Sequence, residues 1–188
     1  APLNFLLETG AAPDYKRELI ALMRQSFDSE QRTAIMFLFV RIDAKDTKPE
    51  IAKLLTVDFV KGDAAKALAM MGATEFEDKI ALLLSDKRSL VRKDAALALG
   101  ILKSVKYAGA LGKLLSAKED FVRLYAAIAL VMMDAKPFLS KAVPIVDRFN
   151  QQRVFLNMGD FHPFVADRAQ TLIDRFNAQL DTAKANTN

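Results

Sequence analysis

The sequence predicts an all-α fold, a short right-handed α-solenoid (superhelix) of about five helix pairs with an irregular insertion before the C-terminal helix. Three segments carry the same pattern, each beginning with a large apolar residue followed by valine: Phe59-Val60, Leu90-Val91 and Phe121-Val122. The three valines are separated by 31 residues each time. A fixed period of this size indicates a helical repeat array, which buries its core by stacking neighbouring units.

Residues 90–115 predict the structure of one unit. A broad apolar face over 90–99 is typical of a helix packed between two neighbours. Gly100 follows at the position where helices commonly end in the left-handed conformation, so we expect the first helix to stop there. The second helix has its own apolar stripe: Ala108, Leu111, Leu114 and Leu115. Each unit is therefore a helix, a turn and a second helix.

The same register extends in both directions. Upstream, a first helix over 32–38 pairs with a second over 51–55, and the following unit closes over 76–84. The unit that begins at 119 closes over 137–146, where Pro144 interrupts the helical pattern. Since proline lacks an N–H and clashes with the preceding turn, we expect this helix to kink or to begin late.

We interpret residues 1–188 as a single repeat domain. An N-terminal cap covers 1–28, four repeats cover 29–149, an insertion and a C-terminal capping helix cover 150–180, and a polar tail covers 181–188. The final helix repeats the valine–alanine pattern through Val165 and Ala169. Val165 comes 43 residues after Val122, which is 12 more than the period allows, and the additional residues lie around 151–161.

The repeated residues form a recognisable motif. It comprises Val91-Arg92, Ala95-Ala96, Ala98-Leu99-Gly100 and the leucines of the second helix, and it recurs as Val122-Arg123, Ala126-Ala127 and Ala129-Leu130. This motif resembles the HEAT-like repeat of the phycobilisome-lyase-related type. The resemblance implies mainly protein–protein scaffolding, with a few members of the family acting on pigments or DNA. We expect the alanine pairs to allow close helix approach, and the Arg, or Lys61 at the equivalent position, to meet carbonyls or acidic groups of an adjacent unit.

Composition excludes several classes of chemistry. The chain has no Cys and a single His, so disulfides, thiolate nucleophiles, common zinc sites and a His-based metal site are not expected. Because no phosphate-binding glycine loop or nucleophile motif is present either, we predict no enzyme, no cofactor and no metal. No apolar run reaches the roughly 20 residues of a membrane span, so no membrane partner is expected. The absence of an initial Met would fit removal of an export signal, but cytoplasmic and exported locations both remain open.

The charge pattern suggests where a partner would bind. The net charge is +4, and acidic residues are interspersed among the basic ones. Second helices usually line the concave binding surface of such arrays, and their expected exposed cations are Lys48, Lys53, Lys79, Lys106, Lys113, Lys141 and Arg148. Seven cations could attract an acidic protein or a nucleic-acid backbone.

The insertion contains a second group of candidates. Asp160 and His162 lie two positions apart, and Arg153 precedes them. An Asp–His pair could support acid–base chemistry, bind a partner, or simply order a loop and cap the final helix. Because insertions in repeat proteins often emerge on the binding face, we expect Arg153, Asp160 and His162 at one end of the concave groove, beside Lys141 and Arg148.

The sequence leaves two functional hypotheses. The first is a non-catalytic protein-binding or scaffolding module (an adaptor, an inhibitor or an immunity-type protein) that binds through Lys106, Lys113, Lys141, Arg148 and the insertion residues. The alternative is a nucleic-acid-binding solenoid that uses the basic residues of the concave face. A steep loss of affinity with salt would identify the second. Partner identity and oligomeric state are not determined by the sequence.

Overall fold

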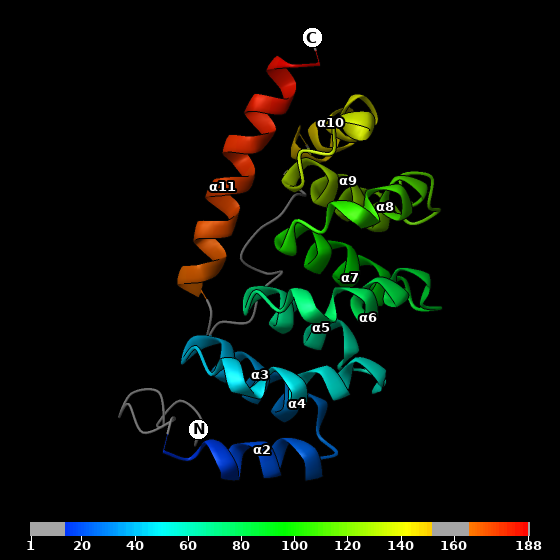
Figure 1. Ribbon diagram of the computed structural model, residues 1–188. Helices are drawn as coiled ribbons and strands as arrows, with labels where there is room; N and C mark the ends of the chain where they lie inside the picture. The colour runs from blue at the N-terminus through cyan, green and yellow to red at the C-terminus, as the bar shows by residue number, and fades with distance from the viewer. Residues whose placement is uncertain (1–13, 152–165, 188) are drawn as a thin grey trace.

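The computed structural model describes residues 14–151 and 166–187 (Figure 1). Its α-helices are α2 (Lys16–Gln25), α3 (Ser29–Arg41), α4 (Lys48–Lys53), α5 (Lys61–Met70), α6 (Glu77–Leu82), α7 (Ser89–Leu102), α8 (Ala108–Leu114), α9 (Asp120–Met132), α10 (Lys136–Gln151) and α11 (Ala166–Ala185). Short 3-10 turns flank the second helices, and these two ranges contain no strand. The predicted all-α solenoid is therefore confirmed. Across the same ranges, no helix has the length and apolarity that crossing a membrane requires.

Four helix pairs follow one another in the described part of the chain: α3 and α4, α5 and α6, α7 and α8, and α9 and α10. Helices α4, α6 and α8 each contact the first helix of the following unit. The first helices pack side by side in the order α3, α5, α7, α9, and each second helix packs beside them (Figure 1). Each first helix is almost uniformly apolar over its last two turns, which lie between two neighbours and have no solvent face. This arrangement gives the broad apolar pattern predicted from the sequence.

Small residues set the distance between the first helices. Ala65, Ala96 and Ala127, which the period places at equivalent positions, are all fully buried. This result confirms the register. Because alanine has only a methyl group, neighbouring first helices approach closely along this row, and the interior is filled by dispersion contacts.

Gly100 has a different role from the predicted one. Helix α7 continues through Gly100 to Leu102, and Lys103 adopts the left-handed conformation at its end, with φ 54°. A Cβ atom on Gly100 would lie 2.8 Å from the Ala129 Cα and 3.0 Å from the Ala129 Cβ in α9. The glycine is therefore required for helix contact. The sequence signal was ambiguous because helix ends and close approaches both favour glycine.

A left-handed residue nevertheless ends the first helix of every described unit. These residues are Asp43, Gly72, Lys103 and Asp134. In each case the following residue donates its N–H to a carbonyl five positions earlier, as Ser104 does to Leu99 at 3.1 Å. This is the Schellman arrangement, which satisfies helix-end carbonyls and turns the chain toward the second helix.

Helix α10 begins early and runs through Pro144 without a break in its assignment. The expectation of a late start is therefore wrong. Pro144 has no N–H to donate to the carbonyl of Ser140, so one internal hydrogen bond is missing on this side of α10. Val143 and Val146, on either side of the proline, remain buried against the core and hold the helix in place.

Helix α11 crosses the stack and does not form its next layer. Near its start, Asp167 pairs with Arg41 at the end of α3, at 2.7 Å. Near its end, Gln179 donates to the Met132 carbonyl of α9 at 3.1 Å, and Lys184 pairs with Asp147 of α10 at 2.6 Å. Figure 1 shows α11 as a long diagonal helix on the left, beside the C-terminal ends of the first helices. The capping helix expected within 150–180 continues to Ala185, into the segment predicted as a polar tail, and forms a strap across the repeats.

Candidate protein-binding surfaces

Four of the seven predicted cations of the second helices are engaged with other side chains. Lys48 pairs with Glu75 at 3.3 Å, Lys53 pairs with Glu50 at 2.8 Å, and Lys79 lies over the ring of Phe76. Lys106 pairs with Glu77 at 2.5 Å and with Asp78 at 2.8 Å, and these contacts raise its pKa above the ordinary value of 10.5. The charges of Lys48, Lys53 and Lys106 are therefore compensated by acidic side chains, whereas Lys79 has only the ring contact.

The other three cations are exposed and form no ion pair with any described residue: Lys113, Lys141 and Arg148. Helix α8, which carries Lys113, has no acidic residue. In α10 the single acidic residue, Asp147, is already paired with Lys184. The outer surface of α8 and α10, which we call the basic second-helix face, therefore has an uncompensated positive charge.

The basic second-helix face also contains small, exposed residues. Gly109 and Ala110 are exposed on α8, and a Cβ atom on Gly109 would meet nothing within 4 Å. Leu82 of α6, which occupies in the preceding unit the position of Lys113, is 76% exposed. The second helices therefore expose an apolar side chain and small residues as well as cations.

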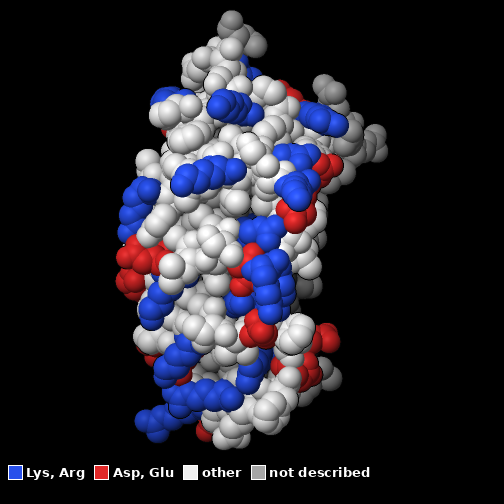
Figure 2. All heavy atoms as spheres, turned by 90° about the vertical axis from the view of Figure 1, so that its right-hand side faces the viewer, with Lys and Arg blue, Asp and Glu red and all other residues white. Residues whose placement is uncertain are grey.

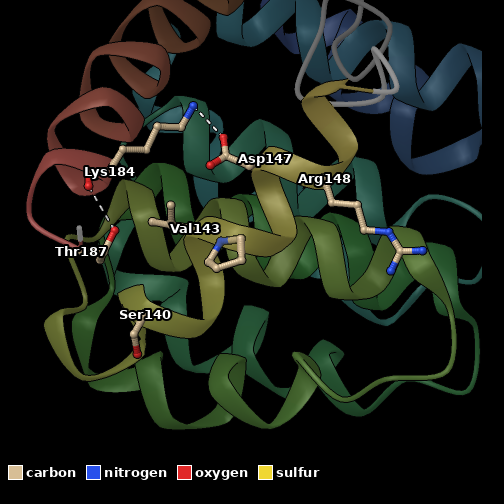
Figure 3. Close-up of a pocket in the computed structure, with 7 residues that line it drawn as sticks. Ser140, Val143, Asp147, Arg148, Lys184 and Thr187 are labelled. Atoms are coloured by element: carbon tan, nitrogen blue, oxygen red, sulfur yellow. Dashed lines mark hydrogen bonds and ion pairs between the residues drawn. The ribbon is translucent and has the colours of Figure 1, made fainter.

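A hollow of about 460 Å³ lies at the end of this face, between α10 and the last turn of α11. Figure 3 shows Lys184 and Asp147 directed toward each other, with the Arg148 side chain extending away from them. Ser140, Val143, Pro144 and Thr187 complete the lining. Within the hollow the charges of Lys184 and Asp147 are paired with each other, whereas Arg148 has no ion pair with a described residue.

Three sequence-predicted candidates, Arg153, Asp160 and His162, lie outside the described residues, as does most of the insertion. Their expected position beside Lys141 and Arg148 stays a prediction. Within the described ranges, no three His, Cys, Asp or Glu side chains form a group that could hold a metal ion.

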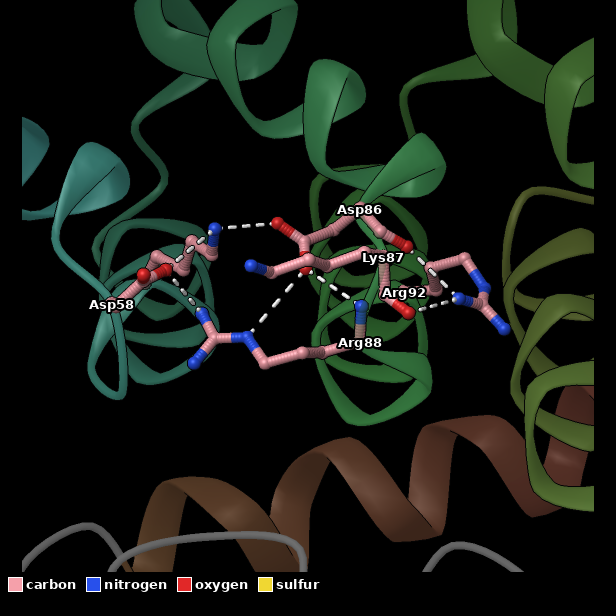
Figure 4. Close-up of polar contacts among 6 residues, drawn as sticks. Asp58, Asp86, Lys87, Arg88 and Arg92 are labelled. Atoms are coloured by element: carbon pink, nitrogen blue, oxygen red, sulfur yellow. Dashed lines mark hydrogen bonds and ion pairs between the residues drawn. The ribbon is translucent and has the colours of Figure 1, made fainter.

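The turns that precede α5 and α7 are joined by a polar network (Figure 4), which Arg92 extends to the turn before α9. Lys61 bridges Asp58 at 3.1 Å and Asp86 of the next unit at 2.5 Å, and the hydrogen bond with Asp86 raises the pKa of Lys61. Arg92 donates to the Asp86 carbonyl at 2.9 Å and pairs with Glu119 of the following unit at 2.9 Å. The motif cations therefore contact carbonyls and adjacent units, as predicted.

A second charged group lies between α5 and α7. Lys66 is 8% exposed and lies 3.1 Å from Asp63 and 3.4 Å from Asp94. Burial raises the pKa of Asp94, although the nearby lysines lower it. Gly62 makes room for this carboxylate, since a Cβ there would lie 2.5 Å from Asp94 Oδ2. This group is best explained as an internal contact between units.

The turns also contain an apolar row that sequence reasoning missed. Leu90 was predicted as part of the buried face of α7, but its side chain is 63% exposed. Phe59, at the equivalent position of the preceding unit, is 83% exposed, and Phe121 is half-buried. The signal was present, because all three begin the repeated segments, but a helical periodicity does not distinguish the first turn of a helix from its buried turns.

Figure 2 shows the side of the molecule opposite α11, where Lys and Arg are spread along its whole height among uncharged residues and scattered Asp and Glu.

Residues 59–131, from the turn before α5 to the end of α9, match the family model for HEAT repeats. No curated protein matches the chain. Residues 59–131 therefore carry HEAT repeats, and helix pairs of the same kind continue on both sides of them.

Proposed function

We propose that this chain is a non-catalytic protein-binding or scaffolding module, and that its basic second-helix face binds an acidic surface of a partner protein. HEAT repeats typically mediate protein–protein interactions. The observation that carries the proposal is the absence of ion pairs, among the described residues, for Lys113, Lys141 and Arg148. A carboxylate that approaches these side chains gains an interaction without displacing an existing partner.

The arrangement of small and apolar groups supports a protein partner. One partner side chain could lie over Gly109 and Ala110 and another could contact Leu82, while carboxylates meet the three cations. Apolar contact surrounded by complementary charge is the usual composition of protein–protein interfaces. We also propose, from the Val-Arg and Ala-Ala motifs, that the repeats are of the phycobilisome-lyase-related type.

A nucleic-acid partner is the second candidate, because free cations also attract phosphates. Two observations weigh against it. The two cations of α4, Lys48 and Lys53, are paired with Glu75 and Glu50, which shortens any continuous basic track. The exposed aromatic side chains of the described residues, Tyr15, Phe27 and Phe59, do not lie on second helices, so bases would find no stacking platform there.

The experiment compares two double charge reversals. Lys141→Glu with Arg148→Glu changes the basic second-helix face, whereas Arg17→Glu with Arg175→Glu changes exposed cations of α2 and α11 by the same net charge. After affinity capture and identification of a partner from the source cells, titration of the purified partner should show a loss of about tenfold or more for the first pair only. Equal effects of the two pairs would overturn the proposed site.

Titration of labelled duplex and single-stranded DNA at low and physiological salt separates the two candidates. If the chain binds nucleic acid through several phosphates, the affinity falls steeply with salt and the face variant reduces the slope. We expect no such binding. A strong, salt-dependent interaction that requires Lys141 and Arg148 would replace the protein-binding proposal with the nucleic-acid one.

A further inference from the structure

The side of the stack opposite α11 presents two large apolar side chains next to each other. Phe59 and Leu90 are 83% and 63% exposed, and both line a depression of about 610 Å³ at the starts of α5 and α7. They occupy equivalent positions in consecutive units, and half-buried Phe121 continues the row. We call the turns that precede α5, α7 and α9, with this row, the turn edge. It is separate from the basic second-helix face.

Phe59 combines an exposed side chain with an unfavourable backbone conformation. Phe59 has φ 72°, in the left-handed region that bulky residues with a Cβ atom avoid. The ring recovers little by burial, and its one described aromatic contact is with the Arg88 guanidinium, 5.5 Å from the ring centroid. Arg88 is held in any case by Asp58 at 2.9 Å. Folding alone would favour Gly or Asn at this position, so the ring is better explained by contact with another molecule.

A row of free cations runs beside the apolar row. Lys87 and Lys118 precede Leu90 and Phe121 by three residues, so they repeat with the same period. Both are exposed and form no ion pair with the described residues, whereas the neighbouring acidic residues Asp58 and Asp86 are already paired. In Figure 4 the Lys87 ammonium takes part in none of the contacts drawn. The charge available to a partner along the turn edge is therefore positive.

We propose that the turn edge is a second docking surface, and that its ligand is an extended, acidic segment of a partner protein with regularly spaced apolar residues. An apolar side chain enters the depression between Phe59 and Leu90, and carboxylates beside it pair with Lys87 and Lys118. This interaction does not require the basic second-helix face, so the two proposals can succeed or fail independently.

The repeat geometry sets the spacing of the segment. Packed helices lie about 8–10 Å apart, so equivalent positions of consecutive units are separated by about that distance. An extended chain in the polyproline II conformation advances about 3.1 Å per residue and presents every third side chain on the same side. Apolar residues at every third position therefore match successive units, and the acidic residues between them face the cationic row.

The test uses a fluorescein-labelled synthetic peptide with Leu at every third position and Glu between, and measures its anisotropy during titration with the full chain. Two control peptides replace every Leu by Ser or every Glu by Lys. We expect saturable binding of the first peptide only. No binding of this peptide at low salt, or equal binding of all three, overturns the proposal.

Variants then locate the contact. Phe59→Gly removes the ring at a position where glycine adopts positive φ freely, so the midpoint of denaturation should be unchanged or higher while the affinity falls by about tenfold or more. Leu90→Ser and the pair Lys87→Glu with Lys118→Glu should weaken binding likewise. A clear loss of stability in Phe59→Gly would show that the ring serves the fold, and would overturn the proposal.

The second-helix variant is the matched control. Lys141→Glu with Arg148→Glu should leave peptide affinity unchanged. If this pair abolishes peptide binding while Phe59→Gly does not, the peptide binds the second-helix face, which overturns the turn edge and favours the proposed function. Loss of a homodimer in Phe59→Gly, measured by light scattering, would instead assign the turn edge to self-association and overturn the acidic-segment proposal.

Discussion

Gly100 of α7 lies against Ala129 of α9 so closely that a Cβ atom on the glycine would be 2.8 Å from the Ala129 Cα and 3.3 Å from Met132 Sδ. Two first helices of consecutive units are therefore in backbone contact at this point. The contact is within the match to HEAT repeats, and it explains why the buried part of α7 contains a residue with a low helix propensity.

Substitution of Gly100 by Ala should destabilise the protein despite the better helix propensity of alanine. The added methyl group meets backbone, which cannot rotate away, so α7 and α9 must separate. We expect a loss of about 1–3 kcal/mol in the free energy of unfolding, measured by chemical denaturation.

Gly109→Ala is the matched control, since a Cβ on Gly109 meets nothing within 4 Å. This variant should be neutral or more stable by up to about 1 kcal/mol, because the propensity term acts alone. If Gly100→Ala behaved like Gly109→Ala, the close approach of α7 and α9 would be refuted.

Protonation of Asp86 at low pH should weaken its contact with Lys61 and so destabilise the folded protein. Burial alone would raise the pKa of Asp86, but hydrogen bonds from Lys61 and the Arg88 backbone outweigh it and hold the pKa below the ordinary value of 3.8. A carboxyl group whose pKa is lower in the folded state than in the unfolded state stabilises the protein fully at pH values above its unfolded-state pKa. This stabilisation is lost as the pH falls through the folded-state pKa. The free energy of unfolding should therefore decline below about pH 4.

Asp86→Asn tests this assignment. The variant should be less stable by about 1 kcal/mol at neutral pH, and its stability should fall less steeply on acidification. Asp181→Asn, at an exposed position of α11, should follow the parent at every pH. Parallel curves for Asp86→Asn and the parent protein would mean that Asp86 does not carry the acid sensitivity.

Burial of the apolar face of α11, and not the Arg41–Asp167 ion pair, should hold this helix against the repeats. Phe176 is fully buried, whereas Arg41 and Asp167 are 46% and 79% exposed. Phe176→Ala should cost about 3–5 kcal/mol, and Arg41→Ala no more than about 1 kcal/mol. Amide hydrogen exchange in α11 reports the effect directly. Faster exchange after Arg41→Ala than after Phe176→Ala would reverse this ranking.

Local patterns predicted the repeated part of this protein well. The 31-residue spacing located α5, α7 and α9 and the buried row of Ala65, Ala96 and Ala127, because each unit must present the same small surface to its neighbours. The motif cations were also predicted correctly, since Arg92 and Arg123 contact carbonyls close to them in sequence. These features depend on interactions within one unit or between adjacent units.

The candidate surfaces were predicted only in part. Lys113, Lys141 and Arg148 were identified from helix position, but Lys106 was grouped with them although Glu77 and Asp78 of the preceding unit neutralise it. The exposure of Phe59 and Leu90 was missed, because burial of a residue in the first turn depends on how far the neighbouring unit extends.

The sequence by itself determined the helix pairs, their period and the small residues between them, since a repeat array is specified by local pattern and nearest-neighbour contacts. Only the tertiary structure decided which cations remain unpaired, which apolar side chains face solvent, and where α11 lies. Those features depend on contacts such as Arg41 with Asp167, 126 residues apart, which no periodicity encodes. The strap occupies the ends of the first helices because its apolar face can be buried there, which leaves the opposite turn edge uncovered in the described structure.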